Sequence, residues 1–284
     1  MADLRRMRPE DAPEVHDLNV LTFEALDVSL GVEPPPRPDP AVAMPRYVHL
    51  ATTDPDGAWV AESEGEIVGV ALALRREDVW ALSLLLVRPD HQSSGIGGAL
   101  LARAHAYAEG ARGRIIMASP DPRALRAYSK LGLDLLPYVS AVGTPKPADP
   151  PPGIRVGDAS DIPLTETVDR YVRGAARGQD IAVMLQMRQT LLIAPERGYA
   201  VINADNAVRI IGALDDEAAA DLLRAALARS SGKVTIECLT ARQQWAIPVV
   251  LEAGLELRTN SDGAMFTSGE VGTFTPYLPS GAFL

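Results

Sequence analysis

The chain has 284 residues, which is enough for one large domain or for two domains of ordinary size. Hydrophobic residues make up 47% of it and charged residues 23%, which excludes an intrinsically disordered chain. The 27 basic and 37 acidic residues give a net charge of -10. This is the opposite of the basic surplus that nucleic-acid or anionic-membrane binding requires, so we expect neither partner.

Three features bear on the location of the protein. The sequence has no apolar run long enough to span a bilayer. Its first residues lack the apolar core and the small-residue cleavage site of a secretory signal. Cys238 is the only cysteine and cannot form an intrachain disulfide, which fits a reducing compartment. We therefore expect a cytoplasmic protein, and its oligomeric state stays open.

The first half of the chain shows helical and strand periodicities in turn. The predicted elements are helices over 10–26 and 40–52, strands over 59–61, 67–74 and 80–87, a helix over 97–108, a strand over 114–118 and a helix over 123–131. The three consecutive strands predict an antiparallel meander, and Gly132 ends the last helix. The proline-rich stretch 33–40 predicts a stiff loop between the first two helices.

A break follows at Thr144 to Gly153, where five prolines in ten residues cannot continue a helix or a central strand. It predicts a linker between two domains, over residues 1–146 and 153–284. The halves resemble each other in three segments that occur in the same order, which indicates an ancient duplication. Chance similarity between two α/β segments is the alternative. The matching pairs are 4–13 with 154–163, 57–62 with 198–203, and 131–135 with 253–257.

The segment 84–101 carries the strongest chemical signal. An apolar strand stops at Pro89, a polar loop follows, and a helix starts among glycines. This suits a phosphate or pyrophosphate, because free backbone N–H groups and the positive end of a helix then face the ligand. The segment lacks the Gly-Lys-Ser/Thr of the nucleoside-triphosphate loop. Polar residues between the strand and Gly95 also exclude the dinucleotide fingerprint.

The same segment resembles the pyrophosphate-binding motif of the GCN5-related N-acetyltransferase (GNAT) family, which is a strand ending in Val-x-Pro followed by Gln/Arg-x-x-Gly-x-Gly/Ala. Val87 to Pro89 and Gln92 to Gly97 match it position by position. The resemblance implies that acetyl-CoA binds here, with its pyrophosphate on the N–H groups of the loop and its pantetheine arm along the strand end. An ordinary glycine-rich loop that caps a helix is the alternative. The cofactor-binding residues that the resemblance implies are Leu85, Leu86, Val87, Gln92, Ser93, Ser94, Gly95, Ile96, Gly97, Gly98 and Asp121.

A second match lies downstream, where Asp121 to Leu133 resembles the family pattern Asn-x-x-Ala-x-x-x-Tyr-x-x-x-Gly-Phe. By this resemblance Tyr128 is the general acid. A phenol can protonate the departing thiolate of CoA, because its pKa of about 10 leaves it with a proton to donate at neutral pH. A packed helix aromatic is the alternative for Tyr128. The chain departs from the pattern at Asp121, where Asn is usual, and at Leu133, where Phe is usual.

The general base has no clear candidate. Many family members carry a Glu on the strand before the loop, but here residues 81–86 include no acid. Glu24, Asp27 and Glu62 are possible bases, and a solvated surface acid is the alternative for each of them. His91 lies in the loop, where a surface role is the simpler interpretation. The sequence has no His/Cys cluster with metal-ligand spacing, so we expect no metal.

The second half resembles the first without its motifs. Val250 stands at the place of Tyr128, and residues 212–221 have acids where the phosphates would lie. The sequence therefore predicts an α/β (α+β) fold of two tandem acetyltransferase-like domains. Each is a mixed, mostly antiparallel sheet flanked by helices, and the second is degenerate.

We expect an N-acetyltransferase that moves an acetyl group from acetyl-CoA to a small-molecule amine. The alternatives are a non-catalytic CoA-binding sensor or scaffold, and an acyltransferase that acts on a protein amine. The apolar residues 274–284 predict a docked C-terminal segment. One interpretation docks it along the cleft between the two domains, with the carboxylate of Leu284 near the acceptor, and the other has the segment complete the sheet of the second domain.

Overall fold

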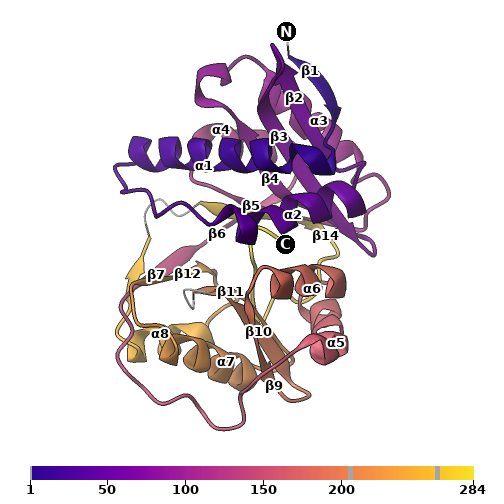
Figure 1. Ribbon diagram of the computed structural model, residues 1–284. Coiled ribbons are helices and arrows are strands. Elements are labelled where there is room, and N and C mark those ends of the chain that lie inside the picture. The colour runs from indigo at the N-terminus through magenta and orange to yellow at the C-terminus, as the bar shows by residue number, and fades with distance from the viewer. Residues whose placement is uncertain (1, 204–206, 260–262) are drawn as a thin grey trace. The chain divides into compact units, whose positions relative to one another are not determined.

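The computed structural model of the chain describes residues 2–203, 207–259 and 263–284 (Figure 1). The chain forms two compact units. The first comprises Met1–Ala111 together with Gly281–Leu284, and the second comprises Arg112–Ser280. Within the described ranges no helix is long and apolar enough to cross a membrane.

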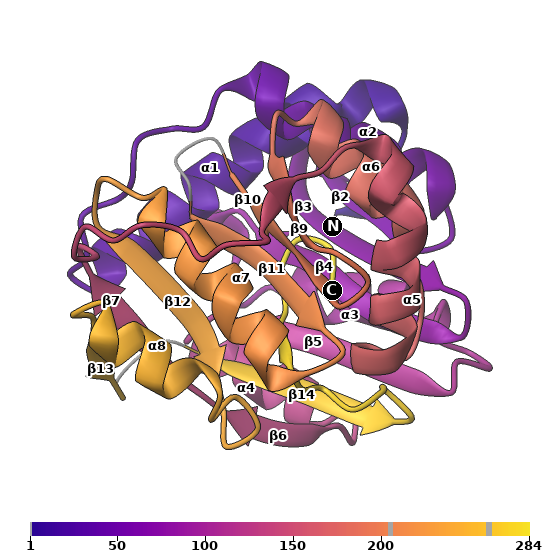
Figure 2. The ribbon, with the colours of Figure 1, turned by 90° about the horizontal axis from the view of Figure 1, so that it is seen from below.

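The elements of the first unit are β1 Asp3–Arg6, α1 Ala12–Ser29, α2 Pro40–Thr53, β2 Ala58–Ser63, β3 Glu66–Arg76, β4 Val79–Val87 and α3 Ile96–Ala106. The strands form an antiparallel sheet in the order β1-β2-β3-β4. Residues with positive φ make the tight turns that join them, Glu64 and Gly65 after β2 and Glu77 after β3. Helices α1 and α2 lie on one face of the sheet and α3 on the other (Figures 1 and 2).

The strands of the second unit are β5 Gly113–Ala118, β6 Asp134–Pro137, β7 Val139–Gly143, β8 Arg155–Val156, β9 Thr190–Ala194, β10 Gly198–Ile202, β11 Val208–Ala213, β12 Val234–Leu239, β13 Glu256–Arg258, β14 Ala264–Gly269 and β15 Tyr277–Leu278. Its helices are α4 Pro122–Ser129, α5 Ile162–Val172, α6 Gly178–Gln186, α7 Asp216–Ala228 and α8 Ala246–Glu252. The elements predicted for the first half of the chain are confirmed to within three residues at each end.

The main sheet of the second half has the order β8-β9-β10-β11-β15 and is antiparallel. Its two faces pack on different helices. Ala200 and Ile202 of β10 join the apolar cluster with Leu222 and Leu223 of α7. On the other face, a Cβ at Gly212 would approach Val168 of α5 to 3.0 Å. The sheet is therefore covered by α5 on one side and α7 on the other, as in Figure 2.

The two halves of the sequence exchange a strand. Strand β14, from the second half, lies between β5 and β6, where Phe266 is opposite Ile116 and Leu135. Strand β7, from the first half, lies between β12 and β13, where Ala141 is opposite Ile236 and Leu257. Both pairings cross the predicted linker. The two compact units accordingly divide between Ala111 and Arg112, and the linker lies inside the second unit.

The duplication is visible in matching hydrogen bonds as well as in topology. The guanidinium of Arg5 donates to both carboxylate oxygens of Asp11, at 2.7 and 3.0 Å. At an offset of 150 residues Arg155 binds Asp161 in the same way, and in both repeats the backbone N–H three residues before the Asp donates to its Oδ2. Two of the three predicted sequence matches thus join equivalent elements, at β1 with β8 and at the α4–β6 and α8–β13 turns.

The third match is wrong by one strand. It pairs residues 57–62 with 198–203, which equates β2 with β10. In the sheets β10 holds the third place, as β3 does in its own sheet, and β9 is the counterpart of β2. Short apolar strands that follow a glycine resemble one another whatever their place in a sheet, so the pattern could not separate β9 from β10.

Candidate active site

The polar loop between β4 and α3 has a shape set by a few residues. Pro89, which has no N–H, begins a short 3₁₀ turn that ends at His91. Ser93 has a φ of 63° and Gly95 a φ of 90°, and Gly95 is the residue that precedes the first turn of α3. A side chain at the position of Gly95 would be strained, so the helix start depends on a glycine there.

The loop is tied back onto the strand that it follows. The side-chain amide of Gln92 donates to the carbonyl of Val87 at 2.9 Å, and Ser94 Oγ donates to the carbonyl of His91 at 2.5 Å. The backbone N–H of Gln92 is directed to the carbonyl of Pro89, at 3.4 Å. The predicted binding residue Gln92 is thus placed where its side chain holds the loop in position.

The backbone N–H groups of Ser93 to Gly98 have no hydrogen-bond acceptor within the described part of the chain. The last three of them belong to the first turn of α3, whose N–H groups point out of the helix and carry its partial positive charge. Space is open above them, because a Cβ built at Gly95 or Gly98 would meet no atom within 4 Å. These six N–H groups fit a pyrophosphate, as an anion at a helix N-terminus is bound by such groups.

The strand end that precedes the loop is regular, but the middle of β4 is not. Leu85 and Leu86 lie opposite Ala71 and Val70 in an unbroken ladder. Further back, Leu72 faces Leu84 whereas Ala73 faces Leu82, so Ser83 is an extra residue that forms a β-bulge. The strand periodicity of the sequence does not predict this bulge. Its signal was Ser83 itself, the one polar residue in the strand Val79–Val87.

Tyr128 lies on α4 in the second unit and is 5% exposed. Its ring packs edge-on against Phe266, with 5.7 Å between the ring centroids and 75° between the ring planes. Burial, and to a lesser degree the nearby charge of Asp121, raises the pKa of the Tyr128 hydroxyl well above its usual range. The hydroxyl therefore keeps its proton at neutral pH, as a general acid must, and its role stays a prediction beside the packing that the structure shows.

Asp121 caps the start of α4. Its carboxylate accepts from the backbone N–H of Arg123 at 2.8 Å and from the guanidinium of the same residue at 2.7 Å. Burial acts to raise the pKa of Asp121, but the hydrogen bonds from the Arg123 side chain and backbone outweigh it and leave the pKa below its usual range. The replacement of the family's Asn by Asp is therefore compatible with the same capping position.

The possible bases differ in their surroundings. Glu24 pairs with Arg37 at 2.7 Å and Glu62 pairs with Arg5 at 2.8 Å. Burial raises the pKa of the Asp27 carboxyl group, so this group takes up a proton more readily than an exposed aspartate does. His91 Nδ1 lies 2.9 Å from Asp90. In the described ranges no group of three or more His, Cys, Asp or Glu residues is arranged to hold a metal ion.

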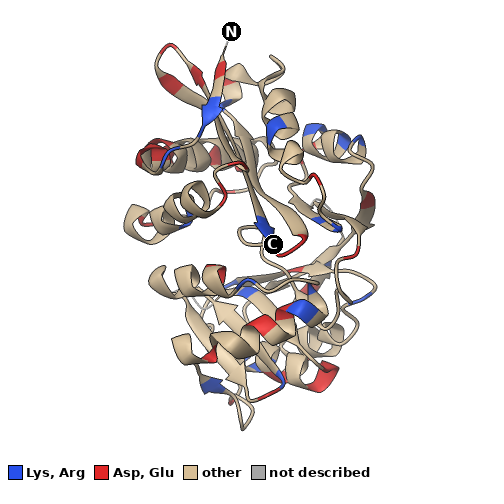
Figure 3. Ribbon diagram, turned by 90° about the vertical axis from the view of Figure 1, so that its right-hand side faces the viewer, with Lys and Arg blue, Asp and Glu red and all other residues tan. Residues whose placement is uncertain are grey.

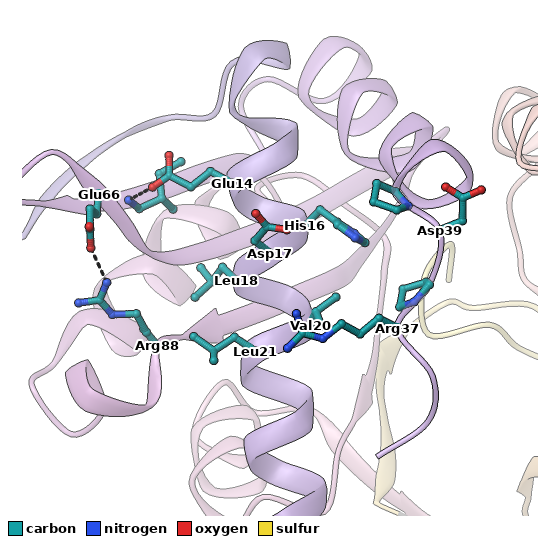
Figure 4. A pocket seen from close by; sticks show the side chains of 13 residues that line it. Glu14, His16, Asp17, Leu18, Val20, Leu21, Arg37, Asp39, Glu66 and Arg88 are labelled. Carbon is teal, nitrogen blue, oxygen red and sulfur yellow. Dashed lines mark hydrogen bonds and ion pairs between the residues drawn. The ribbon is translucent and has the colours of Figure 1, made fainter.

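A pocket of about 750 Å³ opens in the first unit, beside α1 and the segment 37–40 (Figure 4). It reaches Arg88, the residue that follows β4 directly, and Ile67 near the start of β3. Two arginines lie in its wall. Arg37 forms an ion pair with Glu24, and Arg88 forms ion pairs with Glu66 and Asp90. Its lining carboxylates are Glu14, Asp17, Asp39 and Glu66.

Comparison with known proteins identifies this arrangement. The sequence profile of the acetyltransferase (GNAT) family matches residues 19–133, which include the strand, the loop, α3 and Tyr128. Residues 19–133 belong to the GNAT family. No curated protein sequence matches the chain.

Solved structures show that the whole chain, not only its first half, has the tandem GNAT fold. A putative acetyltransferase from Pyrococcus horikoshii has a TM-score of 0.77 at 15% identity, over 98% of this chain and 94% of that one. A tandem GNAT protein from the clavulanic acid biosynthesis pathway has a TM-score of 0.56 at 15% identity, over 95% and 98%. A GCN5-related N-acetyltransferase from Sphaerobacter thermophilus has a TM-score of 0.57 at 16% identity, over 94% and 95%.

The second GNAT-like repeat has no counterpart of the loop. Eight residues, 88–95, separate β4 from α3, whereas two residues, 214–215, separate β11 from α7. Asp215 caps α7 by accepting from the N–H of Ala218 at 2.9 Å. Strand β15 pairs with the last residues of β11, with Ile211 opposite Leu278. The end of β11 is therefore occupied by the chain itself, and the predicted degeneracy of this repeat has a structural form.

Proposed function

We propose that the protein is an acetyl-CoA-dependent N-acetyltransferase whose first repeat binds the cofactor and whose acceptor is a small-molecule amine. Members of the GNAT family use acetyl-CoA, which supplies an activated acetyl thioester. The observation that carries the proposal is the run of N–H groups from Ser93 to Gly98, which is without acceptors in the described chain and faces open space at the start of α3. Leu85 to Val87 would lie along the pantetheine arm.

Tyr128 is the proposed general acid. Its raised pKa keeps the hydroxyl protonated, and a proton donated from it would neutralise the thiolate that leaves. Because a thiol is a stronger acid than this phenol, the proton transfer is uphill by the difference between the two pKa values. The acceptor amine is proposed to enter as the neutral base or to lose its proton to water, so no side-chain base is assigned.

The pocket beside α1 is the proposed acceptor site. Its carboxylates suit a cationic amine, and it adjoins Arg88 at the end of β4. Glu14 accepts from the backbone N–H of Ile67, and Asp39 accepts from that of Ala41, so both carboxylates already have partners. Asp17 has no hydrogen bond or ion pair among the described residues, although its charge acts on Arg37, and it is drawn in the pocket in Figure 4. We assign it to the ammonium group of the acceptor.

The variant Asp17→Asn tests the acceptor site. An exposed ion pair contributes about 0.2–1 kcal/mol, so the KM for a cationic amine should rise by roughly 1.5- to 5-fold while kcat and the KM for acetyl-CoA hold. The exposed Asp149 of the linker offers the matched control Asp149→Asn, which should change neither constant. An unchanged amine KM in Asp17→Asn would place the acceptor elsewhere.

The proposal as a whole is tested by calorimetric titration with CoA, followed by turnover of acetyl-CoA against a panel of amines. One CoA bound per chain together with acetylated small-molecule product is the expected result. Binding without turnover of any amine would favour the sensor or scaffold, and acetylation confined to protein lysines would favour the protein acyltransferase. Absence of binding would overturn the proposal.

We also propose that the protein does not bind nucleic acid and that it is located in the cytoplasm. Basic and acidic residues are interspersed along the elements of both units in Figure 3, and no basic stripe of the kind that follows nucleic acid is drawn among the described residues. Cys238 is buried and unpaired in the described chain, which is compatible with a reducing compartment such as the cytoplasm.

A further inference from the structure

The bulge in β4 is held by side-chain contacts as well as by the strand ladder. Ser83 is 6% exposed. The guanidinium of Arg46, from α2, donates through Nη2 to both the carbonyl oxygen and Oγ of Ser83, at 2.7 Å each. Ser83 Oγ in turn donates to the carbonyl of Ala282 at 2.6 Å. Segments from three distant parts of the sequence thus meet at the one irregular residue of the strand.

The segment Gly281–Leu284, here called the C-terminal segment, is buried at this point. Phe283 is 1% exposed and Leu284 is fully buried. The ring of Phe283 lies 6.0 Å from the guanidinium carbon of Arg46 and 6.3 Å from the ring of His49, both on α2. Because a buried apolar ring is costly to expose to water, Phe283 keeps the C-terminal segment docked at this point.

The residues just before this segment are anchored in the second repeat. Tyr277 and Leu278 form β15 on the edge of β11, and the side-chain amide of Gln243 donates to the carbonyls of Phe274 and Tyr277, at 2.7 and 3.1 Å. The guanidinium of Arg177, itself fully buried, lies 5.4 Å from the centre of the Tyr277 ring. Three residues, 279–281, separate this anchor from Ala282.

We propose that the C-terminal segment is a positioning element of the active strand, and that Ala282 and Phe283 hold the β4 bulge in the form that transfer requires. The bulge sets the direction of the backbone from Leu84 onward, and so of residues 85–87, along which the proposed function places the pantetheine arm. A bulge leaves backbone groups outside the ladder, and their direction depends on what packs against the extra residue.

This inference rests on the proposed function, and its test separates the two. The variant Phe283→Ala removes the ring. Displacement of reacting groups by about 1 Å costs up to about 100-fold in rate, so kcat should fall by about 10- to 100-fold. The affinity for CoA, which depends on the loop at residues 93–98, should stay within about 2-fold. Phe283→Leu, which keeps most of the buried volume, should restore most of kcat.

A second readout needs no turnover. Hydrogen exchange of the peptide that covers residues 82–87 should be at least about 10-fold faster in Phe283→Ala than in the unmodified protein, because the packing that closes the bulge is lost. The exposed Leu251 on α8 provides the control Leu251→Ala, in which neither exchange nor kcat should change. Should Phe283→Ala fail to fold, Ser83→Ala removes the hydrogen bonds to Oγ without opening a large cavity.

The outcomes are distinct. Unchanged exchange at residues 82–87 in a folded Phe283→Ala or Ser83→Ala variant overturns the positioning role, whatever the activity. Unchanged kcat in an active enzyme overturns it as well. A protein that does not bind CoA contradicts the proposed function, while faster exchange in the variants would still show that the segment holds the bulge.

Discussion

The starts of α3 and α7 hold equivalent places in the two repeats, yet their exposed N–H groups differ in what the chain offers them as acceptors. At α3 the groups from Ser93 to Gly98 have no acceptor within the described residues. At α7 the carboxylate of Asp215 accepts from the N–H of Ala218, and Arg197 pairs with both Asp215 and Glu217. Both helices attract negative charge at this end, but α7 takes it from its own chain.

This difference explains how the fold survives loss of the binding site. A helix start with its own cap is stable without a ligand, and the shortened connection of residues 214–215 leaves no loop to order. The pairing of β15 with β11 also covers the strand end that the cofactor would occupy. The first repeat keeps an uncapped start and a loop of eight residues, 88–95, which a ligand can stabilise.

The largest expected effect comes from a charge placed at the start of α3. Gly95→Glu and Gly98→Glu should weaken CoA binding by more than about 100-fold, since a carboxylate beside the pyrophosphate costs several kcal/mol. Gly98 is the cleaner position, because its φ is not positive and a Cβ there meets no atom within 4 Å. Calorimetric titration measures the effect.

The control for this experiment is Gly98→Ala, which adds the Cβ without the charge and should bind CoA within about 3-fold of the unmodified protein. Asp216→Lys at the start of α7 makes the opposite charge change in the second repeat. It should leave the stoichiometry at one CoA per chain. A second bound CoA in any of these proteins would contradict the difference between the two helix starts.

Tyr128→Phe keeps the ring and its contact with Phe266 but removes the acidic proton. We expect kcat to fall by about 10²- to 10⁴-fold, the usual range for a general acid, with CoA affinity unchanged. The equivalent residue of the second repeat is Val250, which is fully buried on α8. Steady-state kinetics at saturating substrates gives the comparison, and an unchanged kcat would remove Tyr128 from the chemistry.

The pKa of Tyr128 also predicts the pH profile. Because burial raises this pKa above the usual value of about 10, the hydroxyl stays protonated throughout the range from pH 7 to pH 10. No loss of kcat in that range should therefore arise from ionisation of Tyr128. An alkaline limb that is present in the unmodified enzyme and absent in Tyr128→Phe would show that the phenol titrates lower than its surroundings imply.

The sequence was sufficient for the local features and for the family. Periodicity and glycines located the meander, the loop and the turn at Gly132, since these depend on neighbours along the chain. It did not predict the exchange of β7 and β14, because each strand has the same apolar pattern whichever repeat it joins. The contact of Ser83 with Ala282 joins residues 199 positions apart, and nothing in either local sequence specifies it.

The docking predicted for the C-terminal residues is confirmed. Strand β15 belongs to the second sheet and Phe283 is buried in the first unit, while the role of the Leu284 carboxylate stays a prediction.

The exchanged strands themselves should differ in their contribution to stability. Phe266 in β14 is fully buried and supports Tyr128, so Phe266→Ala should lower the free energy of unfolding by about 3–5 kcal/mol. Ala141 occupies the same central place in β7, and Ala141→Gly should cost roughly 1 kcal/mol. Denaturant unfolding measures both. A loss in Phe266→Ala no larger than that in Ala141→Gly would mean that the Phe266 ring adds little to the packing, against the contact with Tyr128 that the structure shows.

The smallest expected effect lies at the start of α7. Asp215→Ala removes the cap, which should lower the free energy of unfolding by about 0.5–2 kcal/mol, and it should not create a CoA site, because the connection remains two residues long. Arg197 above all lowers the pKa of Asp215, so the folded state holds this carboxylate ionised more firmly than the unfolded state does. Its contribution to stability is therefore complete above the usual pKa of an aspartate and is lost as the pH falls through the lowered value. The difference in stability between the unmodified protein and Asp215→Ala should narrow when urea unfolding is repeated at progressively lower pH. A difference that persists at a pH where Asp215 is protonated would mean that the carboxylate caps α7 without its charge.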